Sequence, residues 1–324
     1  SYQGTEVSFL HQEEELLSLF FQNLRYNYDI KIIREIHERM ATMIKNALII
    51  ANPGSGKGEA PEYAKKLEKV LFDTYDCTVE VRETTEVGDA EKWAKEAKNN
   101  QKDTVICLGG DGTVNEIVTG LMQVENAPQF SFVPMGTAND LGRVLGFEMD
   151  YDEAVEQFRS LEVDKVDVGQ VNEDYFIDVV AIGDLSTAVM ETDSDKKNKL
   201  VFFAYVIDGT KAIMEGKGDR YEVENSKGET FEFNSNLVLA ALTSSLGGVE
   251  GIVEHGNYKN GQIQFAALKD GLVTSALQTL VDDGGIPREF TDNDNLLAFM
   301  DTNLKLRLLE SDDEKVYSNV DGDE

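Results

Sequence analysis

The part of this chain that most restricts its fold lies between residues 46 and 133, where short apolar runs alternate with segments typical of helices. The apolar runs occupy residues 46–52, 77–82, 104–108 and 130–133, and the helical segments occupy residues 59–72, 88–98 and 113–122. Strands that alternate with helices pair in parallel through right-handed crossovers, so this region predicts an α/β fold with a mainly parallel sheet. Ligands of such sheets bind at the carboxyl ends of the strands.

After residue 164 strand-like runs follow one another with few helices between them. They cover residues 166–171, 175–182, 221–224, 230–242, 263–268, 304–309 and 316–320, and one helical segment covers about 198–214. Successive strands favour an antiparallel sandwich. We therefore expect three parts: a helical extension at residues 1–44, an α/β domain at 45–150 and a strand-rich domain at 151–324.

The first 44 residues carry apolar side chains at helical spacing, at Leu16, Phe20 and Leu24 and again at Ile32 and Ile36. We expect one or two amphipathic helices that pack on the main body or on a second copy of the chain, because the polar positions carry both signs of charge. If the helices pack on a second copy of the chain, the protein forms a homodimer.

Charge and cysteine usage narrow the possible partners. The 61 acidic residues outnumber the 30 basic ones, and the net charge of -31 repels nucleic acid unless a local basic patch intervenes. Cys77 and Cys107 fall in apolar runs, and no run approaches the ~20 apolar residues that span a bilayer. We expect a reduced cytoplasmic protein with no disulfide, no transmembrane segment and no nucleic-acid partner.

The first predicted strand ends in Asn52, Pro53, Gly54, Ser55 and Gly56, a turn whose glycines let backbone amides approach an anion. The turn resembles a phosphate-binding loop. It is not the Walker pattern, which needs a Ser or Thr after the lysine, where this chain has another glycine. A glycine-rich turn between a strand and a helix is a plain connection about as often as it is a phosphate site.

The third predicted strand is followed by GGDGTVNE at residues 109–116. Glycines in this place bring amides to a helix N-terminus, where the helix dipole favours a phosphate. A carboxylate at Asp111 would repel a bare polyphosphate, so it fits there only if it organises magnesium, accepts a proton or orients a donor. A turn alone is also compatible with the sequence, since Asp-Gly is common in turns and Thr113 is a common N-cap.

A third element, PMGTAND at residues 134–140, also follows a predicted strand and opens a helix. Three such loops at the ends of three strands of one sheet would converge on a single crevice, which argues against three unrelated turns.

In this order and spacing the loops NPGSG, GGDGT and PMGTAND resemble the catalytic domain of the diacylglycerol kinase family, which includes sphingosine and ceramide kinases and bacterial soluble lipid kinases. The resemblance covers residues 45–147 and continues more loosely to NVDGD at 319–323, which is similar to the family's DGE motif. It implies an NAD kinase/phosphofructokinase-like fold with a nucleotide-binding domain and a lipid-substrate domain. It also implies magnesium-assisted, in-line transfer of phosphate from ATP to the hydroxyl of diacylglycerol, or of a related lipid, giving phosphatidic acid.

The same resemblance assigns roles to individual residues. Asp111 would organise magnesium and phosphate, and Asp323 would act as general base on the lipid hydroxyl. The ATP site would comprise Asn52, Pro53, Gly54, Ser55, Gly56, Thr84, Gly109, Gly110, Asp111, Gly112, Thr113, Val114, Asn115 and Thr137.

The chain departs from the family pattern at the expected base, because Asp323 stands where the family has Glu. Asp is one methylene shorter, and a base must come within ~2.6–3.2 Å of its proton. Glu324 follows directly and is the base if the motif is shifted by one residue; a solvated acidic chain end is the alternative. The family usually continues beyond this segment, so a truncated chain is a further expectation.

A second departure concerns a structural magnesium that the family binds at an Asp-Gly of its second domain. The corresponding place here is Asn260-Gly261, with Asn257 before it and Gln262 after it. Amide side chains can ligate through their carbonyls but bring no charge, so we expect Asn257, Asn260 and Gln262 to form a weak site.

Lys196, Lys197 and Lys199 precede a dense apolar and aromatic run at residues 200–205. This segment would touch the membrane that carries a lipid substrate, or else forms a buried helix with a lysine cap.

Two other functions compete with a lipid kinase. NAD kinases and phosphofructokinases share the GGDG loop, but the GTAND element fits the lipid kinases better, and the arginines expected of a phosphofructokinase are not found. A catalytically silent nucleotide- or lipid-binding regulator would fit the change from Glu to Asp at Asp323, whereas the intact Asp111 argues against it.

Overall fold

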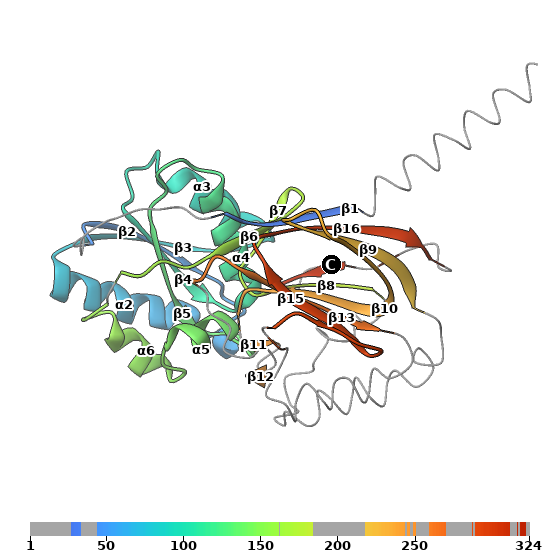
Figure 1. Cartoon of the computed structure of the whole chain (residues 1–324). Coiled ribbons are helices and arrows are strands. Elements are labelled where there is room, and N and C mark those ends of the chain that lie inside the picture. Colours follow the sequence, from blue (N-terminus) through green and yellow to red (C-terminus); the bar gives the residue numbers. More distant parts are fainter. Residues whose placement is uncertain are drawn as a thin grey trace, which may run out of the picture.

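The computed structural model describes residues 27–33, 44–161, 163–183, 218–243, 245–246, 249–250, 259–269, 287, 289–311, 316 and 318–321. Two sheets lie beside each other, one with helices on both faces and the other built of strands (Figure 1). The predicted fold class, a parallel α/β half followed by an antiparallel strand-rich half, is confirmed.

The first half is built on a four-stranded parallel sheet. Its order is β3 (Thr78–Glu83), β2 (Asn46–Ala51), β4 (Thr104–Gly109) and β5 (Gln129–Pro134). Ile49 of β2 lies opposite Val81 of β3 and Ile106 of β4. Because all four strands run the same way, the segments that follow them emerge at one edge of the sheet.

Helices cover both faces of this sheet, since successive residues of a strand point to opposite sides. Ile49 lies in the same apolar core as α2 (Ala60–Tyr75) and α6 (Tyr151–Gln157). Leu48 and Ile50 lie in a second core with α3 (Asp89–Ala97), α4 (Asp111–Met122) and α5 (Asp140–Leu145). This burial on both faces explains the continuous apolar run of β2 in the sequence.

The second half is an antiparallel sheet to which the described residues contribute eleven strands. Nine of them form one path: β14 (Thr291–Asp292), β15 (Leu296–Asp301), β13 (Ile263–Lys269), β10 (Thr230–Ala241), β9 (Asp219–Asn225), β16 (Asn303–Glu310), β1 (Asn27–Ile33), β6 (Val168–Val171) and β7 (Asp174–Phe176). Beside this path, β8 (Val179–Ile182) pairs with β10 and with β17 (Ser318–Val320). A separate short hairpin joins β11 (Ser245–Leu246) to β12 (Val249–Glu250).

The helical extension expected over residues 1–44 is wrong for residues 27–33, which form strand β1 between β16 and β6. Tyr28 and Ile30 are buried while Asp29 between them is exposed, so this stretch has the period of two that a strand requires. The isoleucine spacing that suggested a helix continues beyond the strand. Residues 1–26 and 34–43, and the helix expected at 198–214, lie outside the described residues.

The two halves meet along α4. Ile177, in the turn between β7 and β8, is 2% exposed and lies in the same apolar cluster as Val114 and Val118 of α4. The start of α4 therefore lies at the junction of the two sheets. The division of the chain at residue 150 stays a prediction, and α6, which follows that point, packs in the core of the first sheet.

Close helix packing makes Gly120 a test of this fold. A Cβ at Gly120 of α4 would lie 2.3 Å from the carbonyl oxygen of Glu91 in α3. We expect Gly120→Ala to lower the free energy of unfolding by about 1–3 kcal/mol, because the helices must move apart. Gly112→Ala is the control on the same helix, where the new methyl would meet nothing within 4 Å. Urea unfolding of both variants tests this, and equal stability would contradict the predicted helix contact.

Candidate active site

The three glycine-containing loops predicted from the sequence follow β2, β4 and β5 at one edge of the parallel sheet. The first loop contains the one-turn 3-10 helix η1 (Gly56–Gly58). The second opens α4 and the third opens α5. Each loop is hydrogen-bonded to, or in van der Waals contact with, the other two.

The side chain of Asn52 joins the first loop to the second. Its amide nitrogen Nδ2 donates to Thr113 Oγ1 at 3.1 Å, and its oxygen Oδ1 accepts the backbone N–H of Gly54 at 2.9 Å. Both polar ends of the asparagine are therefore occupied, which holds the turn after β2 against the first turn of α4.

Glycines allow the loops to touch through their backbones. A Cβ at Gly136 would lie 2.6 Å from the Cα of Gly110, and one at Gly110 would lie 2.9 Å from the Cα of Gly136. The first loop reaches the third through Gly56, whose N–H donates to the carbonyl of Met135 at 2.9 Å. No side chain larger than hydrogen fits between Gly110 and Gly136 without a shift of the backbone.

The carboxylate of Asp111 fastens the third loop to the second. Its two oxygens accept the backbone N–H groups of Asn139 at 2.9 Å and Asp140 at 3.1 Å. Burial and the neighbouring charge of Asp140 raise the pKa of Asp111, and the hydrogen bonds from the backbone oppose that rise. Asp111 thus orients donors, one of the three roles that the sequence left open for it.

Asn139 makes the third loop stiff. Its backbone adopts the left-handed conformation with φ 52°, and its side chain accepts the N–H of Gly136 at 2.8 Å and donates to the carbonyl of Gly136 at 2.9 Å. Asparagine adopts this backbone conformation more readily than most residues. The loop is therefore held from within as well as by Asp111.

The edge formed by these loops has the features of a phosphate site. The first amides of α4 have no carbonyl partner within their own helix, and they are the positive end of its dipole. Gly112 is exposed, so a ligand can approach its backbone closely. Asn115, one turn along, is 7% exposed, and its Oδ1 has no hydrogen-bond partner among the described residues.

Comparison with known proteins agrees with this geometry. Residues 46–171 match the diacylglycerol kinase catalytic domain family. A protein of Streptococcus pneumoniae serotype 4 is 30% identical over 280 residues, which cover 86% of this chain and 92% of that protein. The chain belongs to the diacylglycerol kinase catalytic domain family.

A diacylglycerol kinase of Staphylococcus saprophyticus is 35% identical over 223 residues, covering 68% of this chain and 71% of that protein. In structure, a diacylglycerol kinase from Bacillus anthracis str. Sterne matches with a TM-score of 0.66 at 22% identity and covers 86% of this chain and 90% of that one. The structural match supports the fold, and the sequence matches make this chain a kinase of that family.

The remaining predicted nucleotide residues differ in how they are placed. Thr84 lies at the end of β3, and its N–H donates to the carbonyl of Ala51 at 2.9 Å, so it borders the first loop. Thr137 is exposed in the third loop. Val114 is 3% exposed and belongs to the apolar core, so of this residue only the backbone could contact a nucleotide.

The expected metal residues are only partly described. Asn260 Oδ1 accepts the N–H of Gln262 at 2.9 Å, and the N–H of Gly261 donates to the buried carboxylate of Asp167 at 2.5 Å. Asn257 and Asp323 lie outside the described residues. Within the described part, no three His, Cys, Asp or Glu side chains form a metal-binding group, so the weak magnesium site stays a prediction.

Three buried aspartates near the loops were missed from the sequence, namely Asp140, Asp178 and Asp321. Together with Asp111 they form an acidic cluster at the junction of the sheets, since burial, and after it the charges of the other three, raise the pKa of Asp178. They belong to four separate segments of the chain. Asp140 ends the PMGTAND element and Asp321 belongs to the expected DGE motif, but Asp178 had no signal in the sequence.

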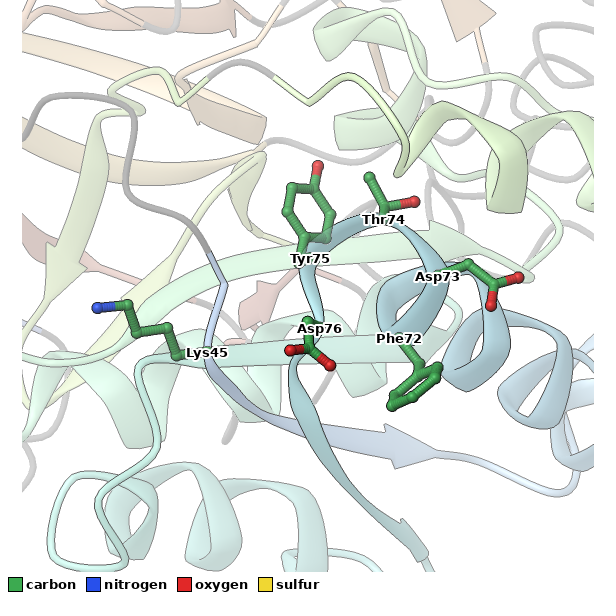
Figure 2. Close-up of a pocket in the computed structure, with 6 residues that line it drawn as sticks. All are labelled: Lys45, Phe72, Asp73, Thr74, Tyr75 and Asp76. Atoms are coloured by element: carbon green, nitrogen blue, oxygen red, sulfur yellow. The ribbon is translucent and has the colours of Figure 1, made fainter.

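A hollow of about 840 Å³ lies away from the three loops. Lys45, Phe72, Asp73, Thr74, Tyr75 and Asp76 line it (Figure 2). Lys45 precedes β2, whereas the candidate loops follow the strands, so this hollow lies at the opposite edge of the parallel sheet. Its open, acidic lining has no glycine loop, and we assign the chemistry to the loops instead.

No helix in the described ranges combines the length and the apolar character needed to cross a lipid bilayer.

The contact between Gly110 and Gly136 gives a prediction for nucleotide binding. We expect Gly110→Ala to weaken ATP binding at least about tenfold, because the new methyl pushes the third loop away and widens the site. Titration with a fluorescent ATP analogue measures this, with circular dichroism as the control for folding. If only Gly112→Ala weakened ATP binding, the glycines would instead be needed so that the phosphate can approach the backbone.

Proposed function

We propose that this protein is an ATP-dependent lipid kinase that transfers the γ-phosphate to the hydroxyl of diacylglycerol or a related lipid. Membership of the diacylglycerol kinase catalytic domain family and the name of the Staphylococcus saprophyticus relative support the reaction class. Diacylglycerol as acceptor would give phosphatidic acid.

The observation that carries the proposal is the joining of the three loops around the start of α4. Asn52, Gly110 and Asp111 each contact a different loop from their own. Phosphoryl transfer needs donor and acceptor to be positioned and the charge on the transferred group to be stabilised. Backbone amides at a helix N-terminus supply that stabilisation without reorganising during the reaction.

Magnesium is the expected companion of ATP here. The acidic cluster would repel a bare polyphosphate, so a nucleotide that carries a divalent cation suits the site better. When bound, magnesium would neutralise charge on the β- and γ-phosphates. Asp111 would act by holding the third loop in place through the amides of Asn139 and Asp140, and so fix the shape of the phosphate site.

The candidate base follows Asp321, a member of the acidic cluster that is 8% exposed. Asp323 would take the proton from the lipid hydroxyl while that oxygen bonds to the γ-phosphorus and ADP leaves with the bridging oxygen. Glu324 is the alternative base if the motif is shifted by one residue. The position of Asp321 supports either Asp323 or Glu324 as the base, because both follow Asp321 within three residues.

A substrate with two acyl chains stays in a bilayer, so the protein would work at a membrane surface from the cytoplasm. Lys196, Lys197 and Lys199 are the proposed contact, because they are a local basic patch in a chain of net charge -31. These lysines lie outside the described residues.

The direct test is transfer of radiolabel from ATP, with magnesium, to a panel of diacylglycerol, sphingosine, undecaprenol and NAD. We expect a labelled lipid product, with diacylglycerol as the best acceptor. Labelled NAD, or no labelled product at all, would overturn the proposed function.

Replacing Asp111 tests the link between the loops. We expect Asp111→Asn to lower kcat by about 10²–10³, because the amide cannot accept both backbone N–H groups and the third loop loses its anchor. Asp103→Asn is the matched control, since Asp103 accepts the N–H groups of Lys45 and Asn46 at the opposite edge of the sheet. Steady-state kinetics should show a defect in the first variant only.

The two acids at the end of the motif give a second pair of variants. If Asp323 is the base, Asp323→Asn should lower single-turnover transfer by about 10²–10⁴. Asp323→Glu should keep or raise the rate, because Glu reaches further, and Glu324→Gln should be near normal. If Glu324→Gln loses activity while Asp323→Asn stays near normal, the base is Glu324 and not Asp323.

A further inference from the structure

The acidic cluster contains two aspartates, Asp178 and Asp321, that the proposed chemistry does not use. They are 4% and 8% exposed. Asp178 interacts with the carboxyls of Asp321, which follows β17, of Asp140 (α5) and of Asp111 (α4), and with the hydroxyl of Thr243, which follows β10. These groups come from the described elements packed around Asp178, and within that part of the chain none of the groups that shift its pKa is a cation. Several buried negative charges without a cation are costly, so some member of the cluster must be neutral.

Asp321 is the member built to carry a charge. Its carboxylate accepts three backbone N–H groups, two from the turn before β8 (Ile177 at 2.6 Å and Asp178 at 3.0 Å) and one from the first residue of β8 (Val179 at 2.8 Å). Its own N–H donates to the carbonyl of Val179 at 3.0 Å. Donors that surround a carboxylate in this way favour its ionised form.

Asp178 is the member with an unsatisfied atom. Its Oδ1 is buried and has no hydrogen-bond partner among the described residues, and the same residue's N–H is bonded to Asp321. Buried polar atoms without a partner are rare. A proton on Asp178 removes the anomaly, because a neutral carboxyl can donate an O–H to a carboxylate.

We propose that Asp178 is a positioning residue that keeps a proton at neutral pH and donates it in a hydrogen bond to the carboxylate of Asp321. The consequence for catalysis rests on the proposed function, because Asp321 is separated by one residue from the candidate base Asp323. The shared proton would hold Asp321, at the end of β17, on the residues that open β8, and so fix the point from which the base-bearing segment continues.

The pKa of both carboxyls is raised by burial, but backbone N–H donors oppose the rise at Asp321 and neighbouring carboxylates reinforce it at Asp178. Burial raises the pKa of Asp321 to about 7, and burial together with the neighbouring carboxylates raises the pKa of Asp178 well above its usual value. A carboxyl whose pKa is higher in the folded than in the unfolded protein binds more protons when folded. Its stabilising contribution is complete below the unfolded pKa of about 4 and is lost as the pH rises through the folded pKa.

Urea unfolding between pH 5 and pH 8 tests the proton directly. One proton bound only in the folded state makes the unfolding constant rise about tenfold per pH unit within the window. We expect this slope in the wild type and in Asp174→Asn, an exposed acid on β7. In Asp178→Asn the unfolding constant should depend less on pH, by up to tenfold per pH unit. Asparagine needs no bound proton, because its amide donates to Asp321 at every pH.

Kinetics test the positioning role. We expect the alkaline decline of kcat to move to higher pH in Asp178→Asn, with the KM for ATP unchanged because the contact between Asn52 and Thr113 is untouched. Asp178→Ala, which lacks the donor, should lower kcat at every pH. Rescue by asparagine but not by alanine distinguishes positioning by a hydrogen bond from simple filling of space.

Parallel stability slopes in the wild type and Asp178→Asn would overturn the inference while leaving an active lipid kinase intact. If the stability slopes of the wild type and Asp178→Asn differ but neither protein transfers phosphate to any acceptor, the positioning role and the proposed function are both refuted. Only the proton shared by Asp178 and Asp321 would then stand. If Asp178→Asn does not fold, infrared spectra of the wild type at pH 7 decide the matter, because a protonated carboxyl has a C=O stretch that a carboxylate lacks. Absence of that band would overturn the proposal.

Discussion

The two hydrogen bonds that end on the carboxylate of Asp111 are the interaction on which the site depends. They join the start of α4 to the start of α5, and with the contact between Gly110 and Gly136 they fix the distance between two loops. A negative group at a helix N-terminus would ordinarily occupy the place where a phosphate binds. Because Asp111 turns its oxygens to the next loop, the amides that follow it stay available for a ligand.

The strands of the parallel sheet and the convergence of the three loops were predictable, since the ends of parallel strands meet at one edge. The role of Asp111 was not, because its partners are backbone N–H groups 28 and 29 residues away. Strand β1 was missed for a different reason. Its alternation of buried and exposed residues is short, and the isoleucines that continue past it have the spacing of a helix.

Asp178 and Asp321 could not be paired from the sequence either, since 143 residues separate them. They become neighbours because β17 pairs with β8 and because the turn before β8 is buried against α4. The burial of the apolar residue Ile177 therefore determines where Asp178 and Asp321 meet. Patterns of single residues along a chain carry no information about such contacts, which depend on how the two sheets dock.

This docking links the two halves of the reaction that we propose. The phosphate site belongs to the first sheet, whereas the segment that carries the candidate base belongs to the second. Both are attached to α4, the first through Thr113 and the second through the burial of Ile177 against Val114. A change in the packing of this helix would alter the distance between donor and acceptor even where no site residue changes, because the rate depends steeply on that distance.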